Sequence, residues 1–118
     1  MYLIAPIGVE IGDGKFMPLF PGDTRIPASA SSVFGTAVND QAFMELHVLQ
    51  GESPEVVKNR SLGRYRLEGL AKGPRGQVQF QVTFQISATG LLAVKAMDLI
   101  TGYPITVAGP PDRIVYIK

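Results

Sequence analysis

The sequence predicts an all-β fold, an antiparallel β-sandwich of about eight short strands that forms a single domain over residues 1–118. Three observations predict it. The 13 Gly and 9 Pro residues fall between short apolar runs, which favours tight turns over long helices. Hydrophobic residues make up 46% of the chain and charged residues 18%, as in a globular protein with one core. Apolar and polar residues alternate strictly from Gln79 to Ser87, which is the period of a half-buried strand.

The first half of the chain is expected to begin with a β-hairpin over residues 8–20, with Gly-Asp-Gly at 12–14 as its turn. Pro18 lies inside the second strand and cannot donate a backbone hydrogen bond, so this strand should be a sheet edge or carry a bulge. Prolines and a glycine between residues 21 and 27 mark a loop. Further strands are expected at VFGTAVN (33–39), FMELHVLQG (43–51) and GRYRLEGL (63–70).

The second half continues with a hairpin, in which Ala88–Gly90 form the turn and residues 91–97 the next strand. A Thr-Gly turn leads into another strand at 103–108. The sequence Gly-Pro-Pro-Asp at 109–112 then breaks the chain, and RIVYIK at 113–118 is either an extra strand or the start of a truncated element. No segment predicts a convincing helix.

The charge pattern argues against a nucleic-acid or membrane partner. The formal net charge is +1, so no strong global field attracts polyanions. Six of the 11 basic residues lie between Lys58 and Arg75, which is compatible with an anion-binding or nucleic-acid patch. We favour a solvated strand face with turns, because a single aromatic residue, Tyr65, lies among these charges and no aromatic series is interleaved with them.

Localisation is expected to be cytoplasmic. The absence of Cys excludes disulfides and thiolate chemistry and fits a reducing compartment. The N-terminus has no basic region before its apolar run, as a signal peptide would, and no stretch approaches transmembrane length.

The stretch ELHVLQGE at 45–52 places the single histidine, His47, among carboxylates, which raises the question of catalysis. A serine, His47 and a carboxylate would be the only available triad, and no serine lies in a nucleophile-elbow pattern. A metal site is the alternative, but a lone histidine without a second ligand at strand spacing is weak support. The glycine turns at 12–14 and 73–76 lack the remaining features of calcium or phosphate loops. We therefore expect a partly buried, hydrogen-bonded strand histidine, no catalytic residue and no metal.

Several motifs then occur in an order that carries a resemblance to a known family. They are HVLQGE at 47–52, NRSLGRYRLEGL at 59–70, GPRG at 73–76 and QVTFQISATGLL at 81–92, preceded by IGVEI at 7–11, FMPLFPGDTRIP at 16–27 and SSVFGTA at 31–37. This series strongly resembles the substrate-binding β-sandwich of the seventy-kilodalton heat-shock chaperones, the DnaK family. The resemblance covers residues 7–107 and leaves 108–118 as an atypical tail.

The resemblance implies a chaperone domain that holds extended apolar segments of unfolded polypeptides in a channel framed by loops at one end of the sandwich. By resemblance, the central pocket is lined by Val9, Ile11, Phe34, Met44, Leu46 and Phe80. Backbone contacts are implied for Gly35 and Ala37, with Gln41 nearby. Taken from the residues alone, the six apolar positions fit a plain sandwich core equally well.

Three positions depart from the family pattern. Met44 stands where the family commonly has a small Val, which suggests a shallower or more plastic pocket. Gly12 stands where the family places a residue that arches over the peptide towards Ala37, so we expect a more open channel with faster exchange. Arg75 matches a basic residue that latches the family's helical lid, and Asn39 replaces its usual acidic companion, with Asp40 adjacent.

The resemblance also implies functions that lie outside this chain. We expect no helical lid within residues 109–118, because they do not look like its first helix, and residues 1–7 do not look like the linker from the ATPase domain. The chain is then either a domain of a longer chaperone or a divergent relative with altered coupling. ATP and magnesium would bind a nucleotide-binding domain of a parent chain, assisted by a J-domain co-chaperone and an exchange factor. We expect no enzymatic activity and no cofactor in this domain. The alternative is a divergent member that acts as a protein-interaction or scaffold module, and the tail RIVYIK suggests self-association by occupying another copy's channel.

Overall fold

The computed structural model describes residues 1–12, 14–110 and 113–118. These residues form strands and one turn of 3-10 helix, in the order β1 (Ile7–Ile11), β2 (Lys15–Phe20), β3 (Ala28–Gly35), β4 (Phe43–Gln50), η1 (Val56–Lys58), β5 (Arg60–Glu68), β6 (Gln79–Ile86), β7 (Leu91–Asp98), β8 (Pro104–Ala108) and β9 (Arg113–Ile114).

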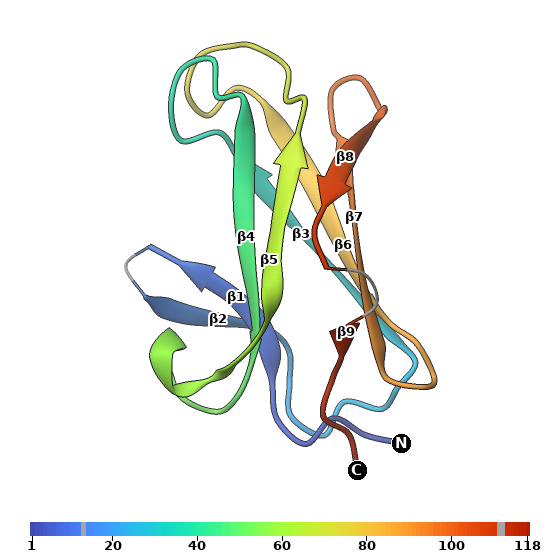
Figure 1. The fold of residues 1–118 in the computed structure, drawn as a ribbon. Helices are drawn as coiled ribbons and strands as arrows, with labels where there is room; N and C mark the ends of the chain where they lie inside the picture. The colour runs from blue at the N-terminus through green and yellow to red at the C-terminus, as the bar shows by residue number, and fades with distance from the viewer. Residues whose placement is uncertain (13, 111–112) are drawn as a thin grey trace.

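The strands form two antiparallel layers that are joined along one side (Figure 1). One layer has the order β2-β1-β4-β5 and the other has the order β7-β6-β3. β8 pairs with both β5 and β7 and so connects the layers, and β9 pairs with β7. β2 and β3 are left as the two edge strands of the continuous path. The predicted antiparallel β-sandwich is confirmed.

The core lies between the layers and is built by the alternation seen in the sequence. In β6 the residues Phe80, Val82, Phe84 and Ile86 are buried, and the polar residues between them are half-buried or exposed. Because successive side chains of a strand point to opposite faces, this alternation fixes which face of β6 meets the other layer. Leu67 of β5 is also fully buried.

The first hairpin forms as the sequence predicts, with Asp13 of its Gly-Asp-Gly turn outside the described residues. Pro18 lies on β2, an edge strand, as expected of a residue without a backbone N–H. It pairs with Gly8 next to a register shift in β1. A Cβ on Gly8 would lie 2.0 Å from the carbonyl oxygen of Met17, so this close approach of the two strands requires glycine.

Two strand boundaries differ from the prediction. β3 begins at Ala28 rather than Val33, because a segment of Ala and Ser can still pair with β6 over its whole length without presenting large apolar residues. β3 ends at Gly35, and residues 36–42 form a loop. The expected strand over 33–39 is therefore wrong in its second half. β5 begins at Arg60, three residues before the predicted start.

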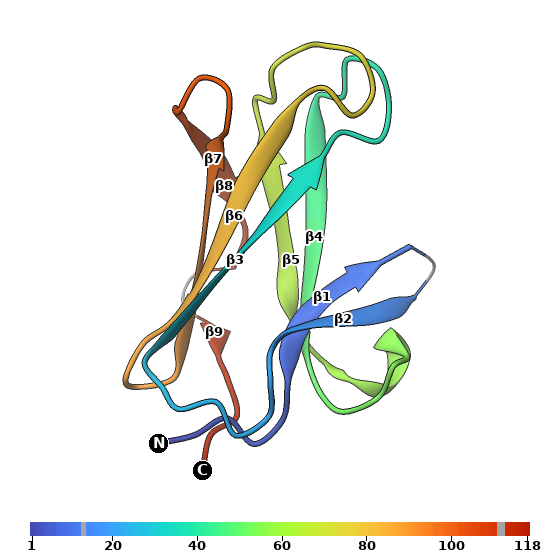
Figure 2. The same ribbon diagram turned by 180° about the vertical axis from the view of Figure 1, so that it is seen from behind.

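The C-terminal segment joins the sandwich as an extra strand, although the preceding break includes residues 111 and 112, which lie outside the described residues. β9 pairs with β7, and Val115 is 1% exposed within the core. Tyr2 and Lys118 exchange backbone hydrogen bonds of 2.8 and 2.7 Å, so the two termini lie side by side (Figure 2). The tail is therefore packed against its own sandwich. Self-association through the tail would require it to leave this position and stays a prediction.

Candidate functional site

The loop between β3 and β4 is held in shape by Gln41. The backbone N–H of Ala37 donates to Oε1 of Gln41 at 2.7 Å, and Nε2 of Gln41 donates to the carbonyl oxygen of Phe43 at 2.8 Å. One side chain therefore fixes both the apex of the loop and the start of β4. The N–H of Ala37 is therefore engaged within the chain.

A second set of contacts ties this loop to the β5–β6 loop. Both the hydroxyl and the carbonyl oxygen of Thr36 accept from the N–H of Gly76, at 3.0 and 2.9 Å. Oδ1 of Asn39 accepts from the N–H of Arg75 at 2.8 Å, and the N–H of Asp40 donates to Gly73 at 2.8 Å. The two loops therefore stand together at one end of the sandwich (Figure 1). Arg75 lies exposed on this rim, where its role as a lid latch stays a prediction.

The six apolar residues assigned to the pocket differ in depth. Val9, Leu46 and Phe80 are buried, at 0%, 2% and 0% exposure. Phe34 and Met44 are half-buried and pack against this core, and Ile11 is 42% exposed. The rings of Phe34 and Phe80 stack with centroids 6.4 Å apart. The buried three could form only the floor of a pocket, whereas the other three reach the surface.

The residues assigned to the rim come from two separate parts of the fold. Gly12 lies at the tip of the β1–β2 hairpin, and Gly35 and Ala37 lie at the end of β3 and in the following loop. All three are exposed. In both ribbon views the hairpin and the β3–β4 loop diverge from the sandwich on the same side (Figures 1 and 2). Gly12 adopts φ +54°, a left-handed conformation that suits glycine, and nothing lies within 4 Å of its Cβ position.

His47 is a half-buried strand residue with two hydrogen-bond partners, as the sequence analysis predicted. Its Nδ1 lies 2.9 Å from Oε1 of Glu10, and its Nε2 lies 2.8 Å from the hydroxyl of Ser61. This connectivity is that of a serine–histidine–carboxylate triad. Ser61 is exposed, and its oxygen already accepts from the N–H of Gly63 at 3.3 Å. The sequence analysis missed Glu10 and Ser61, because their contact with His47 depends on strand register.

The basic residues between 58 and 75 are mostly paired on the surface, which agrees with a solvated strand face. Arg64 forms an ion pair with Glu45 at 3.1 Å, and the guanidinium of Arg66 lies 3.6 Å from the ring centroid of Phe43. Arg60 lies in the same way over Tyr116, at 3.9 Å. These contacts engage the cationic heads locally on the outer face of β5.

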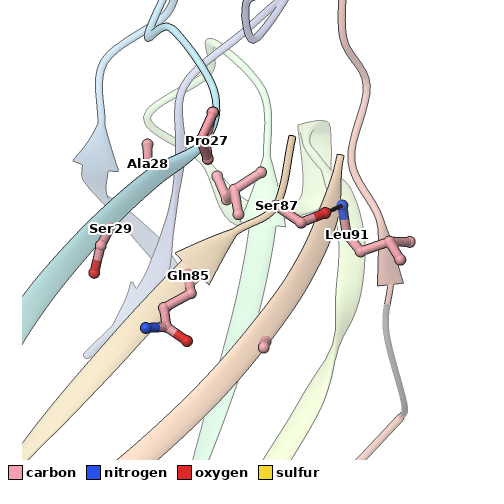
Figure 3. Close-up of a pocket in the computed structure, with 8 residues that line it drawn as sticks. Pro27, Ala28, Ser29, Gln85, Ser87 and Leu91 are labelled. Carbon is pink, nitrogen blue, oxygen red and sulfur yellow. Dashed lines mark hydrogen bonds between the residues drawn. The ribbon is translucent and has the colours of Figure 1, made fainter. Parts of the chain in front are cut away.

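A different groove lies at the opposite end of the sandwich, where β3 begins and β6 turns into β7 (Figure 3). It has a volume of about 560 Å³ and is lined mostly by small and apolar groups, including Pro27, Ala28 and Leu91. The hydroxyl of Ser87 in its wall accepts from the N–H of Leu91 at 3.0 Å. This groove contains none of the residues assigned to the channel.

Metal ligands do not cluster in the part of the chain that the structure describes: no group of three or more His, Cys, Asp or Glu side chains there could hold an ion. Within the same residues, no helix has the length and hydrophobicity needed to cross a membrane.

Comparison with known proteins decides the family. The model of the family described as Hsp70 protein matches residues 3–110, nearly the whole chain. The chain belongs to the Hsp70 family. The resemblance found in the sequence motifs is thereby confirmed.

Among the relatives, the chaperone protein DnaK of Methanothermobacter thermautotrophicus is 44% identical over 106 residues, which cover 88% of this chain and 18% of the relative. The chaperone protein dnaK of Guillardia theta is 46% identical over 114 residues, covering 92% and 18%. The chaperone protein dnaK3 of Synechococcus elongatus is 45% identical over 101 residues, covering 86% and 14%. This Hsp70-family chain therefore spans less than a fifth of the length of these relatives.

Proposed function

We propose that this Hsp70-family chain is a chaperone's peptide-binding domain, which holds extended apolar segments of unfolded polypeptides. The channel runs between the β1–β2 hairpin, with Ile11 and Gly12, and the β3–β4 loop, with Gly35 and Ala37. A client chain would pair through its main chain with the exposed backbone of these segments and place one apolar side chain between them. The domain binds without catalysis and without a cofactor of its own.

The graded exposure of the pocket residues carries this proposal. Buried Leu46 and Phe80 provide a rigid floor, half-buried Phe34 and Met44 provide the walls, and Ile11 stands 42% exposed at the rim. Partly exposed apolar side chains above a packed floor are what an apolar client residue would cover. Membership of the Hsp70 family supports the same reading.

The expected affinity is moderate. Burial of one client Leu would contribute about 1.5–3 kcal/mol. Each backbone hydrogen bond would add about 0.5–1.5 kcal/mol. After the cost of association, a dissociation constant near 1 μM, or about −8 kcal/mol, is reasonable. Such an affinity suits a client that must later be released.

The remaining functions belong to the parent protein in this proposal. A nucleotide-binding domain that holds ATP and magnesium would control the affinity for clients, with a J-domain co-chaperone and an exchange factor as partners in the cytoplasm. The relatives are all described as DnaK chaperones, which supports this wider assignment.

A second candidate function is a protein-interaction module without general client binding. The open tip at Gly12 favours it, because no side chain there can close over a bound peptide. The larger Met44 in place of a small residue points the same way.

The deciding experiment is a titration of the domain into a dye-labelled, leucine-centred heptapeptide, followed by fluorescence anisotropy. Saturable binding near 1 μM is expected for the native chain. A Met44→Trp variant should lose binding because the larger ring fills the pocket, and Met97→Trp, on an exposed site of β7, should retain it. Failure of the folded native chain to bind would move the interaction-module function to first place.

A further inference from the structure

The β1–β2 hairpin leaves the body of the sandwich partway along β1. β1 pairs with β2 from Ile7 to Ile11, but it pairs with β4 only as far as Val9. Both ribbon views show the hairpin diverging from β4 beyond this point (Figures 1 and 2). The hairpin residues of the proposed channel, Val9, Ile11 and Gly12, therefore lie at and beyond the place where main-chain pairing to β4 ends.

Glu10 is the first residue of β1 beyond that last pair, and its side chain reaches back to β4. Its Oε1 lies 2.9 Å from Nδ1 of His47, and the two side chains are 27% and 10% exposed. An ionised carboxylate only accepts hydrogen bonds, so Nδ1 carries the proton. In the neutral ring, Nε2 of His47 then accepts from the hydroxyl of Ser61, whose oxygen accepts from the N–H of Gly63. This relay, Gly63–Ser61–His47–Glu10, runs across β5 and β4 to β1.

A bulge in β5 brings Ser61 into the relay. Val48 pairs with Gly63, but its neighbour Leu49 pairs with Ser61, so Leu62 is an extra residue on the β5 side. Leu62 is 1% exposed and fills the core. Because a bulge changes the direction of the adjacent side chains, Ser61 can meet His47 across the outer face of the sheet.

The relay adds a side-chain hydrogen bond between the hairpin and the sandwich to the packing of Met17 and Leu19 against the core. Among the described residues, the Glu10–His47 bond is the one side-chain hydrogen bond that joins residues 7–20 to the rest of the chain. Two backbone bonds tie β2 and the turn to the β4–β5 connection: the N–H of Phe16 donates to Pro54 at 3.0 Å, and that of Val56 donates to Gly14 at 2.9 Å. Any movement of the hairpin beyond Val9 relative to β4 would therefore carry that connection with it, and the relay would oppose the movement.

The opposite side of the proposed channel has no such freedom. The β3–β4 loop is braced internally by Gln41 and is bonded to the β5–β6 loop through Thr36, Asn39 and Asp40. A change in the width of the channel would therefore come from the hairpin.

We infer that Glu10 is a positioning residue of the channel: its carboxylate, oriented by His47 and Ser61, sets the distance between the β1–β2 hairpin and the β3–β4 loop. The effect of this distance on peptide exchange rests on the proposed function. A hydrogen bond to a charged group is stronger than one between neutral groups. Since the pair is partly exposed, we expect its loss to speed peptide dissociation by about 5–10-fold.

The test measures the hairpin position without using the peptide. Because the chain has no Cys, Lys15→Cys and Val38→Cys provide unique spin-label sites on the hairpin and the loop, both exposed. Double electron–electron resonance then gives the distance between them. Glu10→Ala should lengthen and broaden this distance. Glu10→Gln, which can still accept from Nδ1, should restore most of the native distribution. Glu45→Ala removes an exposed carboxylate of β4 outside the relay and should change nothing.

Peptide dissociation is measured on the same variants with the dye-labelled heptapeptide. The inference is supported if Glu10→Ala shows both a longer label-to-label distance and faster peptide dissociation, and if Glu10→Gln and Glu45→Ala do not. An unchanged distance in folded Glu10→Ala overturns it, whatever the dissociation rate. If the distance changes but no form of the chain, including the native one, binds peptide, then the positioning role stands and the proposed function fails. Should Glu10→Ala not fold, Ser61→Ala must show a smaller change in the same direction, and its absence would overturn the inference.

Discussion

The N–H of Ala37 donates to Oε1 of Gln41 at 2.7 Å, so the apex of the β3–β4 loop is fixed by a side chain four residues further along. The same amide donates to Phe43 from its other end. A carboxylate could not replace this amide, because it offers acceptors but no donor for the carbonyl oxygen of Phe43. Gln41 therefore acts on the proposed channel through the backbone that it holds.

Replacement of Gln41 by Ala is expected to weaken heptapeptide binding by about 5–10-fold. This factor corresponds to the net free energy of about one hydrogen bond, which the native chain uses to order the loop. Amide hydrogen exchange at Ala37 should become faster in the same variant. Gln85→Ala, which removes an exposed amide from the outer face of β6, serves as the control. Native exchange at Ala37 in Gln41→Ala would show that the loop does not need this side chain.

Gly12→Met tests the open tip of the hairpin. A longer side chain could reach over the peptide and slow its dissociation, as proposed from the sequence. The backbone at Gly12 has φ +54°, however, and a non-glycine residue there costs about 1–2 kcal/mol. Gly12→Asn is the matched control, because Asn tolerates this conformation and is too short to close the channel. Slower dissociation in the Met variant than in the Asn variant is the expected result, and equal or faster dissociation would contradict the proposal.

Asp98 governs the stability of the β7–β8 turn. Its side chain is largely buried, and Oδ1 accepts from the N–H groups of Ile100 and Thr101 at 2.8 and 3.0 Å. Asp98→Ala leaves both donors unsatisfied, so the free energy of unfolding should fall by about 2 kcal/mol in urea titration. Asp98→Asn retains an acceptor and should lose less than half of that. Equal losses in both variants would show that the negative charge, and not the geometry of the acceptor, stabilises the turn.

The sequence predicts most of the sandwich because its strands carry their own pattern. The alternation along β6 depends only on neighbouring residues, and Pro18 excludes a central position for β2 by itself. The start of β3 could not be predicted, since Ala28 and the Ser and Ala residues after it show no apolar alternation and are ordered by pairing with β6. The local sequence pattern does not predict a strand whose structure depends on backbone pairing with a neighbouring strand.

The site residues divide in the same way. The apolar positions assigned to the proposed pocket come from the resemblance to the family, and Ile11 is exposed because the hairpin that carries it diverges from β4 after Val9. The Glu10–His47 pair had no signal in the sequence, because the two residues are 37 positions apart and meet only in the observed register. The resemblance to the family therefore predicts which residues line the proposed channel. The contacts that hold these residues in position can be identified only in the structure.

The C-terminal tail provides the last prediction, which concerns stability and association together. Val115 is 1% exposed and packs in the core, whereas Val57 is 87% exposed. Val115→Ala should lower the free energy of unfolding by about 1–3 kcal/mol, because it removes buried methyl groups and leaves a small cavity. Val57→Ala, the same change on the surface, should be close to neutral.

Sedimentation velocity on the same two variants links this cost to self-association. If the tail can leave its own sandwich and occupy the channel of another copy, then Val115→Ala should show a larger fraction of dimer than the native chain at each concentration. The substitution weakens the packing of the tail against its own core. Monomer at every concentration, in both the native chain and Val115→Ala, would show that the pairing of β9 with β7 keeps the tail within its own molecule.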